Sequence, residues 1–479
     1  MIKPIKFIPF MLFMLAILSV AGCQTLKAPS TMFEEWKPPA SKATDDVWTS
    51  VLGQKIDTSK PLALIELVDI ALHNNPSTRQ AWNSARAAEA KKKQAESALY
   101  PQVTASASLE KEKVITHPKS PLYSVSSLGY GPSAGITYLI LDFGGRAATI
   151  DAAYEAMIAA NFQFNQTFQD LLLATETSYY ELHSSYAGLK AAEADLENAK
   201  TSFAAARQKY EVGLVARLDI LQAKSNYENS LFNLEVAKGQ VKTAKANLAK
   251  TIGFPANTAF EITEPSGEMP AQIGEEDVSS LIKEAIEKRP DIAALRASLR
   301  AKQALTKAAN SDLWPKLNSN GSADLTWYKS PGTKNQRTEH QYGYTAALSL
   351  DWDIFDGFSN LNKSREAKIA AEEERARLMQ AELEASADVW IKYYGFKTAV
   401  QKLVFSESFM DTSKSAYDLA LESYKAGLKS ILDLLDAESK LSDARSKLIQ
   451  SKKDVFVALA NLAHATGSTG AKMETKIND

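Results

Sequence analysis

The sequence has few of the side chains from which disulfides, metal sites and catalytic sites are built. It contains one cysteine among 479 residues, and none of its five histidines is followed four residues later by another. These counts exclude a disulfide framework and a thiolate metal cluster within one chain, and they disfavour a histidine metal site. Neither a P-loop nor an H-E-x-x-H motif occurs. We therefore predict that the protein is not an enzyme and holds no metal or diffusible cofactor.

An excess of one charge and repeated long apolar runs are also missing. The 55 basic residues nearly balance the 57 acidic ones, which argues against a nucleic-acid partner. Apolar residues are not gathered into repeated runs of about 18 or more, which excludes a protein with several membrane-spanning helices.

Residues 1–22 have the pattern of a secretory signal peptide. Two lysines begin it, an apolar segment follows from Phe7 to Val20, and small residues precede Cys23. The segment resembles a bacterial lipobox, which implies a covalent lipid on Cys23, and Gln24 in place of aspartate implies the outer membrane. The alternative is an ordinary signal peptide whose removal leaves a free thiol.

The rest of the chain is one unit written twice, with an offset of 214 residues. Residues 62–264 are predicted to form the first structural repeat and residues 265–467 the second, after a proline-containing tether at 23–61 and before a polar tail at 468–479. Matching pairs include Asn75-Pro76 with Arg289-Pro290, Asp142 with Asp356, Tyr179-Tyr180 with Tyr393-Tyr394, Gly213-Leu214 with Gly427-Leu428, and Gly253 with Gly467.

Each half is predicted to contain a helix, two strands and a long helical hairpin. The first helix is expected over about 64–98, with its copy over about 278–311, and a Tyr-Pro or Trp-Pro pair ends it. Strict alternation of apolar and polar residues follows, as in Val103 to Leu109. Strands of about ten residues with this pattern are typical of a transmembrane barrel with a wet lumen, although a soluble sandwich would alternate in the same way.

Four strands per chain are too few to close a barrel, so a barrel requires several chains. The helices are also long, since from Gly145 to Tyr210 only Gly188 interrupts a helical pattern. The returning helix carries a seven-residue repeat from Ile220 to Leu248, which its copy keeps from Leu434 to Leu462. Such a repeat predicts left-handed supercoiling against neighbouring helices.

Over residues 62–467 the sequence resembles the TolC family of outer-membrane efflux and secretion channel proteins, and its lipobox resembles that of the lipoprotein subgroup. The duplication, the turns after the strands at Asp142 and Asp356, and the two hairpin tips carry this resemblance. It implies a mainly α fold with a β-barrel part. Three identical chains would share a twelve-stranded transmembrane β-barrel, four strands from each, and a long α-helical coiled-coil tunnel in the periplasm.

The resemblance also implies roles for residues at the hairpin tips. Asp433 and Asp436 match acids that ring the periplasmic aperture, and Asp219, Tyr424 and Lys429 match contacts that hold this gate shut. Alternatively, Asp219 and Asp433 are helix N-caps. The Gly-Leu pairs match the contact points for periplasmic adaptor proteins, although an exposed leucine beside glycine is also compatible with ordinary turn packing. These pairs are Gly213 with Leu214 and Gly427 with Leu428.

The predicted function is that of a passive trimeric duct in the cell outer membrane. It would export substrates from an inner-membrane transporter and adaptor complex, in efflux or type I secretion. The alternative is a structural periplasmic coiled-coil lipoprotein without channel activity. Amphipathic strands between the helices favour the duct, because a periplasmic spacer has no use for them.

Overall fold

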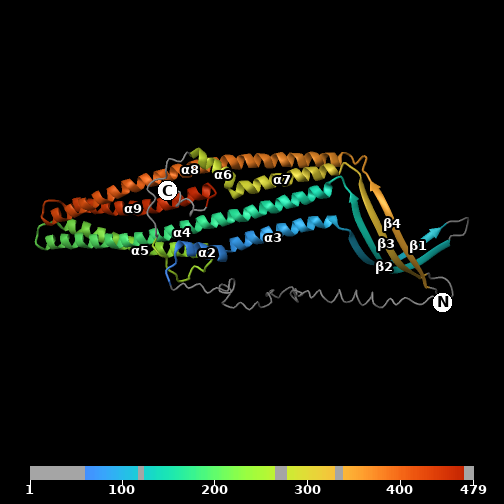
Figure 1. Cartoon of the computed structure of the whole chain (residues 1–479). Coiled ribbons are helices and arrows are strands. Elements are labelled where there is room, and N and C mark those ends of the chain that lie inside the picture. Colours follow the sequence, from blue (N-terminus) through green and yellow to red (C-terminus); the bar gives the residue numbers. More distant parts are fainter. Residues whose placement is uncertain (1–59, 117–122, 265–277, 330–337, 469–479) are drawn as a thin grey trace. The chain divides into compact units, whose positions relative to one another are not determined.

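The computed structural model describes residues 60–116, 123–264, 278–329 and 338–468. The predicted signal peptide, Cys23 and all but the last two residues of the predicted tether lie outside these ranges. Within them, a run of two helices, two strands and two further helices occurs twice (Figure 1).

The bounds of the elements repeat with the offset found in the sequence. Each helix of the second half begins 214 residues after its counterpart, α4 and α8 are both 67 residues long, and α5 and α9 are both 35. The internal duplication is therefore confirmed. The first half comprises α2 (Leu64–Asn74), α3 (Pro76–Glu96), the short 3-10 helix η2 (Ser97–Leu99), β1 (Gln102–Thr116), β2 (Tyr123–Leu141), α4 (Gly145–Glu211) and α5 (Arg217–Thr251). The second comprises α6 (Val278–Lys288), α7 (Pro290–Ser311), β3 (Lys316–Lys329), β4 (Thr338–Asp351), α8 (Ser359–Lys425) and α9 (Ile431–Ala465).

The first predicted helix of each half is in fact two helices, so that prediction is wrong. Asn75 and Arg289 have extended backbones, with ψ of 128° and 126°. Pro76 and Pro290 then open α3 and α7. A proline disfavours helical geometry in the residue before it, while its own fixed φ suits the first helical turn.

These breaks form a joint that receives the end of the returning helix. The Asn75 side chain donates from Nδ2 to the Thr251 carbonyl at 2.8 Å, next to the end of α5. At the same place in the second half, Arg289 donates from Nη1 to the Ala465 carbonyl at 3.4 Å, next to the end of α9. In both halves, therefore, the side chain before the proline binds the last carbonyl of the returning helix, although the residue differs.

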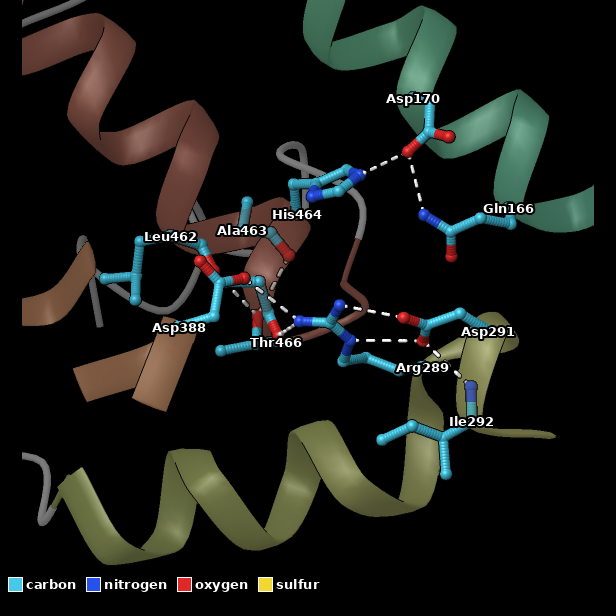
Figure 2. A network of polar contacts seen from close by, with 11 residues as sticks. Gln166, Asp170, Arg289, Asp291, Ile292, Asp388, Leu462, Ala463, His464 and Thr466 are labelled. Atoms are coloured by element: carbon cyan, nitrogen blue, oxygen red, sulfur yellow. Dashed lines mark hydrogen bonds and ion pairs between the residues drawn. The ribbon is translucent and has the colours of Figure 1, made fainter. Parts of the chain in front are cut away.

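The second joint carries charge that the first lacks. The Arg289 guanidinium forms ion pairs with Asp291 at 2.8 Å and with Asp388 of α8 at 3.0 Å (Figure 2). Arg289 is largely buried, and charge-assisted hydrogen bonds of this kind are stronger than neutral ones. The joint thus ties α7, α8 and α9 together.

The four strands form one antiparallel sheet in the order β1-β2-β3-β4. The central pair, β2 with β3, joins the two halves, while β1 and β4 are the edges of the described sheet. The strands have 14 to 19 residues, longer than predicted. Backbone pairing continues into polar segments such as Lys111 opposite Leu128, because a ladder needs hydrogen bonds and no particular side chains.

The apolar face of the sheet is uncovered in the described part of the chain. The register places the predicted alternating residues on one face, and most of the large ones are exposed. A soluble sandwich would bury this face, so its exposure disfavours that alternative. The exposed members include Val103, Leu109, Tyr344, Leu348 and Leu350.

The long helices pack side by side, and their burial depends on how many neighbours they have. Helix α4 contacts α3, α5, α7 and α9, whereas α5 packs almost entirely against α4 (Figure 1). Accordingly, the seven-residue repeat is mostly buried in α9, at Leu434, Leu441, Val455 and Leu462, but only half-buried over most of α5. None of the described helices combines the length and apolar character that a bilayer-spanning helix requires.

Candidate functional site at the helical hairpin tips

Both helical hairpins turn at a Gly-Leu pair with the same backbone geometry. Gly213 and Gly427 have φ of 78° and 81°. The following leucine donates its N–H to the carbonyl five residues back, Leu214 to Lys209 at 2.9 Å and Leu428 to Ser423 at 2.8 Å. This Schellman arrangement ends a helix with glycine in the left-handed region. The glycines thus supply the backbone geometry that ends each helix and reverses the chain.

The leucines of the two turns point away from their own chain. Leu214 is 73% exposed and Leu428 is 80% exposed, so neither packs into the hairpin that carries it. Ordinary turn packing therefore does not explain them. Each tip instead presents an exposed leucine next to a glycine, with further exposed apolar side chains such as Val212 and Leu432 nearby.

The two predicted N-cap carboxylates lie one turn further into their helices. The N-caps are Ala216 and Ser430, and Asp219 and Asp433 are the third helical residues, so the N-cap interpretation is wrong. Asp433 completes a capping box. Its Oδ2 accepts from the Ser430 hydroxyl at 2.8 Å and from the Ser430 N–H at 3.0 Å. These hydrogen bonds, helped by the Lys429 charge, hold the pKa of Asp433 below its usual value.

The other predicted aperture acid has a different local partner. Asp436 forms an exposed ion pair with Lys440, one turn along α9, at 2.7 Å. Asp433 and Asp436 therefore lie on one helical face, as their spacing predicts, but each carboxylate is engaged within its own helix.

The three predicted gate residues gather near the tips but do not bond to one another within this chain. The Tyr424 hydroxyl is buried and has no hydrogen-bond partner. Burial raises the pKa of Tyr424, and the nearby Asp219 charge raises it further. No ion pair of Lys429 is present among the described residues, where only its charge acts on Asp433. The structure thus leaves a buried donor at the site where the gate contacts are expected.

One residue of this site was missed by the sequence reasoning. The Lys209 ammonium lies 4.4 Å from the centre of the Tyr424 ring and donates to the Tyr424 carbonyl. Cation–π contacts of this type hold a side chain in place and stabilise the charge. Lys209 joins the first tip to the second, and because the contact crosses the two halves, no local pattern announces it.

A buried carboxylate behind the tips was also missed. Glu438 accepts from the Ser202 hydroxyl at 2.8 Å and from Asn226 Nδ2 at 2.9 Å. Burial raises the pKa of Glu438, although these two hydrogen bonds oppose the shift. Burial and the Glu438 charge also raise the pKa of Tyr417 to about 12.

The Glu438 cluster opens onto a groove of about 1140 Å³ between α4, α5 and α9. Further along the groove, Asp195 of α4 accepts from Ser442 at 2.6 Å and pairs with Arg445. Glycines and alanines of α4, such as Gly188, line it as well. A polar network therefore follows the line on which the two hairpins meet.

No group of three or more histidine, cysteine, aspartate or glutamate side chains able to hold a metal ion is found in the described ranges. Gly131–Gly135 does match the G-x-S-x-G pattern of hydrolases, but it lies within β2, and Ser133 bonds to the Ser106 hydroxyl at 2.8 Å. That pattern requires a strand-to-helix turn, so its match here has no catalytic meaning.

The chain is similar to outer-membrane export proteins over most of its length. The family model described as outer membrane efflux protein matches residues 67–254 and 281–468, one match in each half. Protein CyaE of Bordetella pertussis is 25% identical over 72% of this chain and 71% of its own length. Pyoverdine export outer membrane protein OpmQ of Pseudomonas aeruginosa is 25% identical over 74% and 75%.

Solved structures share the fold. The outer-membrane channel OprN superposes with a TM-score of 0.75 at 21% identity, covering 91% of this chain and 99% of that one. The outer membrane protein VceC of Vibrio cholerae gives a TM-score of 0.73 at 20% identity, with coverage of 85% and 96%. At this level of identity, the likeness establishes the fold.

Proposed function

The chain belongs to the outer membrane efflux protein family, and we propose that its two hairpin tips form the gate and the partner-contact site of the channel. The protein is an outer-membrane channel of a tripartite export system, with its helices in the periplasm. It works as a homotrimer with a periplasmic adaptor and an inner-membrane transporter. Family and fold are those of channel proteins and not of enzymes.

The observation that carries the gate proposal is the unsatisfied hydroxyl of Tyr424. A buried donor without a partner costs free energy, and the Asp219 carboxylate is close enough to raise the pKa of this group. A small movement of the tips, within a chain or between chains, would allow Asp219 to accept from Tyr424. Lys429 remains free for a carboxylate of a neighbouring chain. These contacts would hold the mouth closed.

Such a gate is weak by construction. An exposed ion pair contributes about 0–1 kcal/mol, so three copies of two or three contacts total a few kcal/mol. That is the range in which a docking partner shifts a two-state equilibrium. We propose that adaptor binding at the exposed leucines, Leu214 and Leu428, with the adjacent Gly213 and Gly427, supplies this free energy.

The acids give the mouth its charge. In a trimer, Asp433 and Asp436 would contribute six carboxylates around the aperture and favour cations. Lys440 partly offsets Asp436, so Asp433 should have the larger effect. We also propose that a lipid on Cys23 anchors the chain beside the barrel that its strands build with those of two further chains.

Conductance in a planar bilayer tests the gate. We expect the wild-type trimer to show small, cation-preferring steps, and Asp219→Ala with Lys429→Ala to raise the single-channel conductance. Asp433→Asn should lower the cation preference. Lys447→Ala is the control, because it removes an exposed cation of α9 whose ion-pair partner is Asp443 and not an aperture acid. Unchanged conductance in the double variant, or an equal rise with Lys447→Ala, would sink the assignment.

A further inference from the structure

The two halves meet within one chain where α4 of the first half packs against α9 of the second. Near the joint, His464 Nε2 of α9 lies 2.7 Å from Asp170 Oδ1 of α4 (Figure 2). Gln166, one turn before Asp170, donates to the same oxygen at 2.8 Å. The carboxylate is therefore held by its own helix and faces the imidazole of the neighbouring one.

The second half has the equivalent carboxylate, but within one chain its partner position lies elsewhere. On α8, Gln380 Nε2 donates to Glu384 Oε1 at 2.8 Å, at the positions equivalent to Gln166 and Asp170. The position equivalent to His464 is Lys250, which is exposed in the last turn of α5. Helices α5 and α8 approach each other near the hairpin tips, where the Asp219 charge acts on Tyr424, but no ion pair joins Glu384 to Lys250 among the described residues. The acid and the cation are therefore both present without meeting in one chain.

We propose that α8 of one chain packs against α5 of the next chain in the register that α4 and α9 use within a chain. Glu384 then pairs with Lys250 of the partner subunit. The inference rests on the trimeric channel stated above, and it adds the residues that join one chain to another.

The exposed side chains of α8 fit this role. Within the chain, Tyr180 of α4 stacks on Phe456 of α9 with ring centres 4.7 Å apart. The equivalent residues are Tyr394, which is 45% exposed, and Lys242, also exposed. A lysine over a tyrosine ring is a favourable cation–π pair. Lys242 and Tyr394 would therefore attract each other between chains, as Phe456 and Tyr180 do within one.

At a second pair of equivalent positions, both residues differ between the two halves. Asp195 and Arg445 form an ion pair between α4 and α9. Their equivalents on α8 and α5 are Phe409 and Leu231, both half-buried in one chain. Replacing one charge alone would leave its partner unpaired, whereas replacing both gives an apolar contact. This paired change is expected if the two positions meet.

Packing between chains would also explain why the seven-residue repeat of α5 is only half-buried. Helix α9 buries its repeat because α4 and α8 flank it, while α5 has α4 on one side only. A second neighbour from the next chain would complete the burial of α5. It would also cover Leu383 of α8, which is 72% exposed beside Glu384.

Cross-linking in native outer membranes tests the register. The full-length chain would carry Glu384→Cys together with Lys250→Cys, and a short bifunctional thiol reagent would be applied before denaturing electrophoresis. We expect linked dimers and trimers from the double variant and none from either single variant. The single variants also reveal any cross-linking through Cys23. Glu384→Cys with Lys242→Cys is the matched control, since the second site lies eight residues, or about 12 Å, away along α5.

Linkage in the control pair instead of the test pair would overturn the register. Absence of linkage in both pairs, in a protein that is trimeric by mass and conducts ions, would overturn the interface while leaving the channel function intact. A monomer without conductance would remove both.

Discussion

At the scale of single residues, the two halves differ in how they hold equivalent carboxylates. Asp433 is locked into a capping box by Ser430, but the N-cap before Asp219 is Ala216, which offers no side-chain acceptor. The backbone at both N-caps is nearly identical, with ψ of 158° and 162°. The difference leaves Asp219 free for the proposed gate contact and commits Asp433 to its own helix.

Exchanging the two N-cap residues should reverse which helix has the more stable first turn. Ser430→Ala should destabilise the first turn of α9 by about 1 kcal/mol, the usual value of a serine N-cap, and Ala216→Ser should stabilise the first turn of α5 by a similar amount. Hydrogen exchange at the two tips would measure both changes. Opposite changes in protection are required; a loss at both tips would contradict the cap assignment.

The Ala216→Ser variant also tests the proposed gate. Once Ala216→Ser recruits the Asp219 carboxylate into a capping box, that carboxylate is less available to Tyr424, and conductance should rise. The depressed pKa of Asp433 sets the pH range of the wild-type cap. Its contribution is present above the ordinary value of 3.8 and is lost as the pH falls through the lower folded value.

Glu438 gives a pH dependence of the opposite sign. Its folded pKa is raised above 4.5 by burial, so between 4.5 and the folded value the folded chain binds more protons than the unfolded chain. Wild-type stability therefore falls as the pH rises through this window. Thermal melting by circular dichroism should show Glu438→Gln gaining on the wild type with rising pH.

Ser202→Ala serves as the companion variant for this experiment. It removes a hydrogen bond that lowers the pKa of Glu438, so it should extend the pH window upward. A difference in melting temperature between wild type and Glu438→Gln that stays constant at all pH values would contradict the raised pKa.

At the scale of elements, the proline breaks decide where the long hairpins end. The joint of the first half depends on one neutral hydrogen bond from Asn75, and that of the second on the ion pairs of Arg289. The Arg289 side chain also binds α8 directly through Asp388, whereas the first joint reaches α4 through a hydrogen bond between Thr251 and Ser178.

Substitution at the two joints should therefore have unequal effects. Arg289→Ala leaves Asp291 and Asp388 without their cation and should destabilise the helices by about 2–3 kcal/mol, while Asn75→Ala should cost about 1 kcal/mol. Thermal melting of the two variants side by side provides the measurement. Equal losses would show that the ion pairs add nothing to the common backbone contact.

At the scale of the whole molecule, the duplication relates contacts within a chain to contacts between chains. In the sheet, β2 and β3 pair across the halves, with Ala134 opposite Ala323. The equivalent positions are Leu348 on edge strand β4 and Leu109 on edge strand β1. A barrel of three chains would then bring Leu348 opposite Leu109 of the partner subunit.

Oxidation of Leu348→Cys with Leu109→Cys should link the chains at this seam. Directly opposite residues of antiparallel strands lie within the range of a disulfide. Leu348→Cys with Val103→Cys is the control, because Val103 is on the same face but about 20 Å along the strand. Covalent trimers from the first pair alone are expected, and linkage through Val103 would refute the register.

What the sequence determined by itself follows from short-range physics. Proline and glycine fix the breaks and turns, alternation fixes the faces of the strands, and the offset of 214 residues fixes the order of elements twice. Pro76 also signals the break at Asn75, although the helical pattern on both sides of it predicts one continuous helix. The turn glycines, the exposed apolar strand face and the family could be inferred at this level.

Only the tertiary structure decided which side chains meet across the halves. The contact of Lys209 with Tyr424, the burial of Glu438 between Ser202 and Asn226, and the use of Ser430 as the cap could not be read from periodicity. Two equivalent helices have nearly the same sequence pattern, yet α9 packs extensively against both α4 and α8, whereas α5 packs against α4 and touches α9 only slightly. Burial, and with it the pKa of a buried carboxylate, depends on that packing, because desolvation is set by what surrounds a group in space and not by its neighbours along the chain.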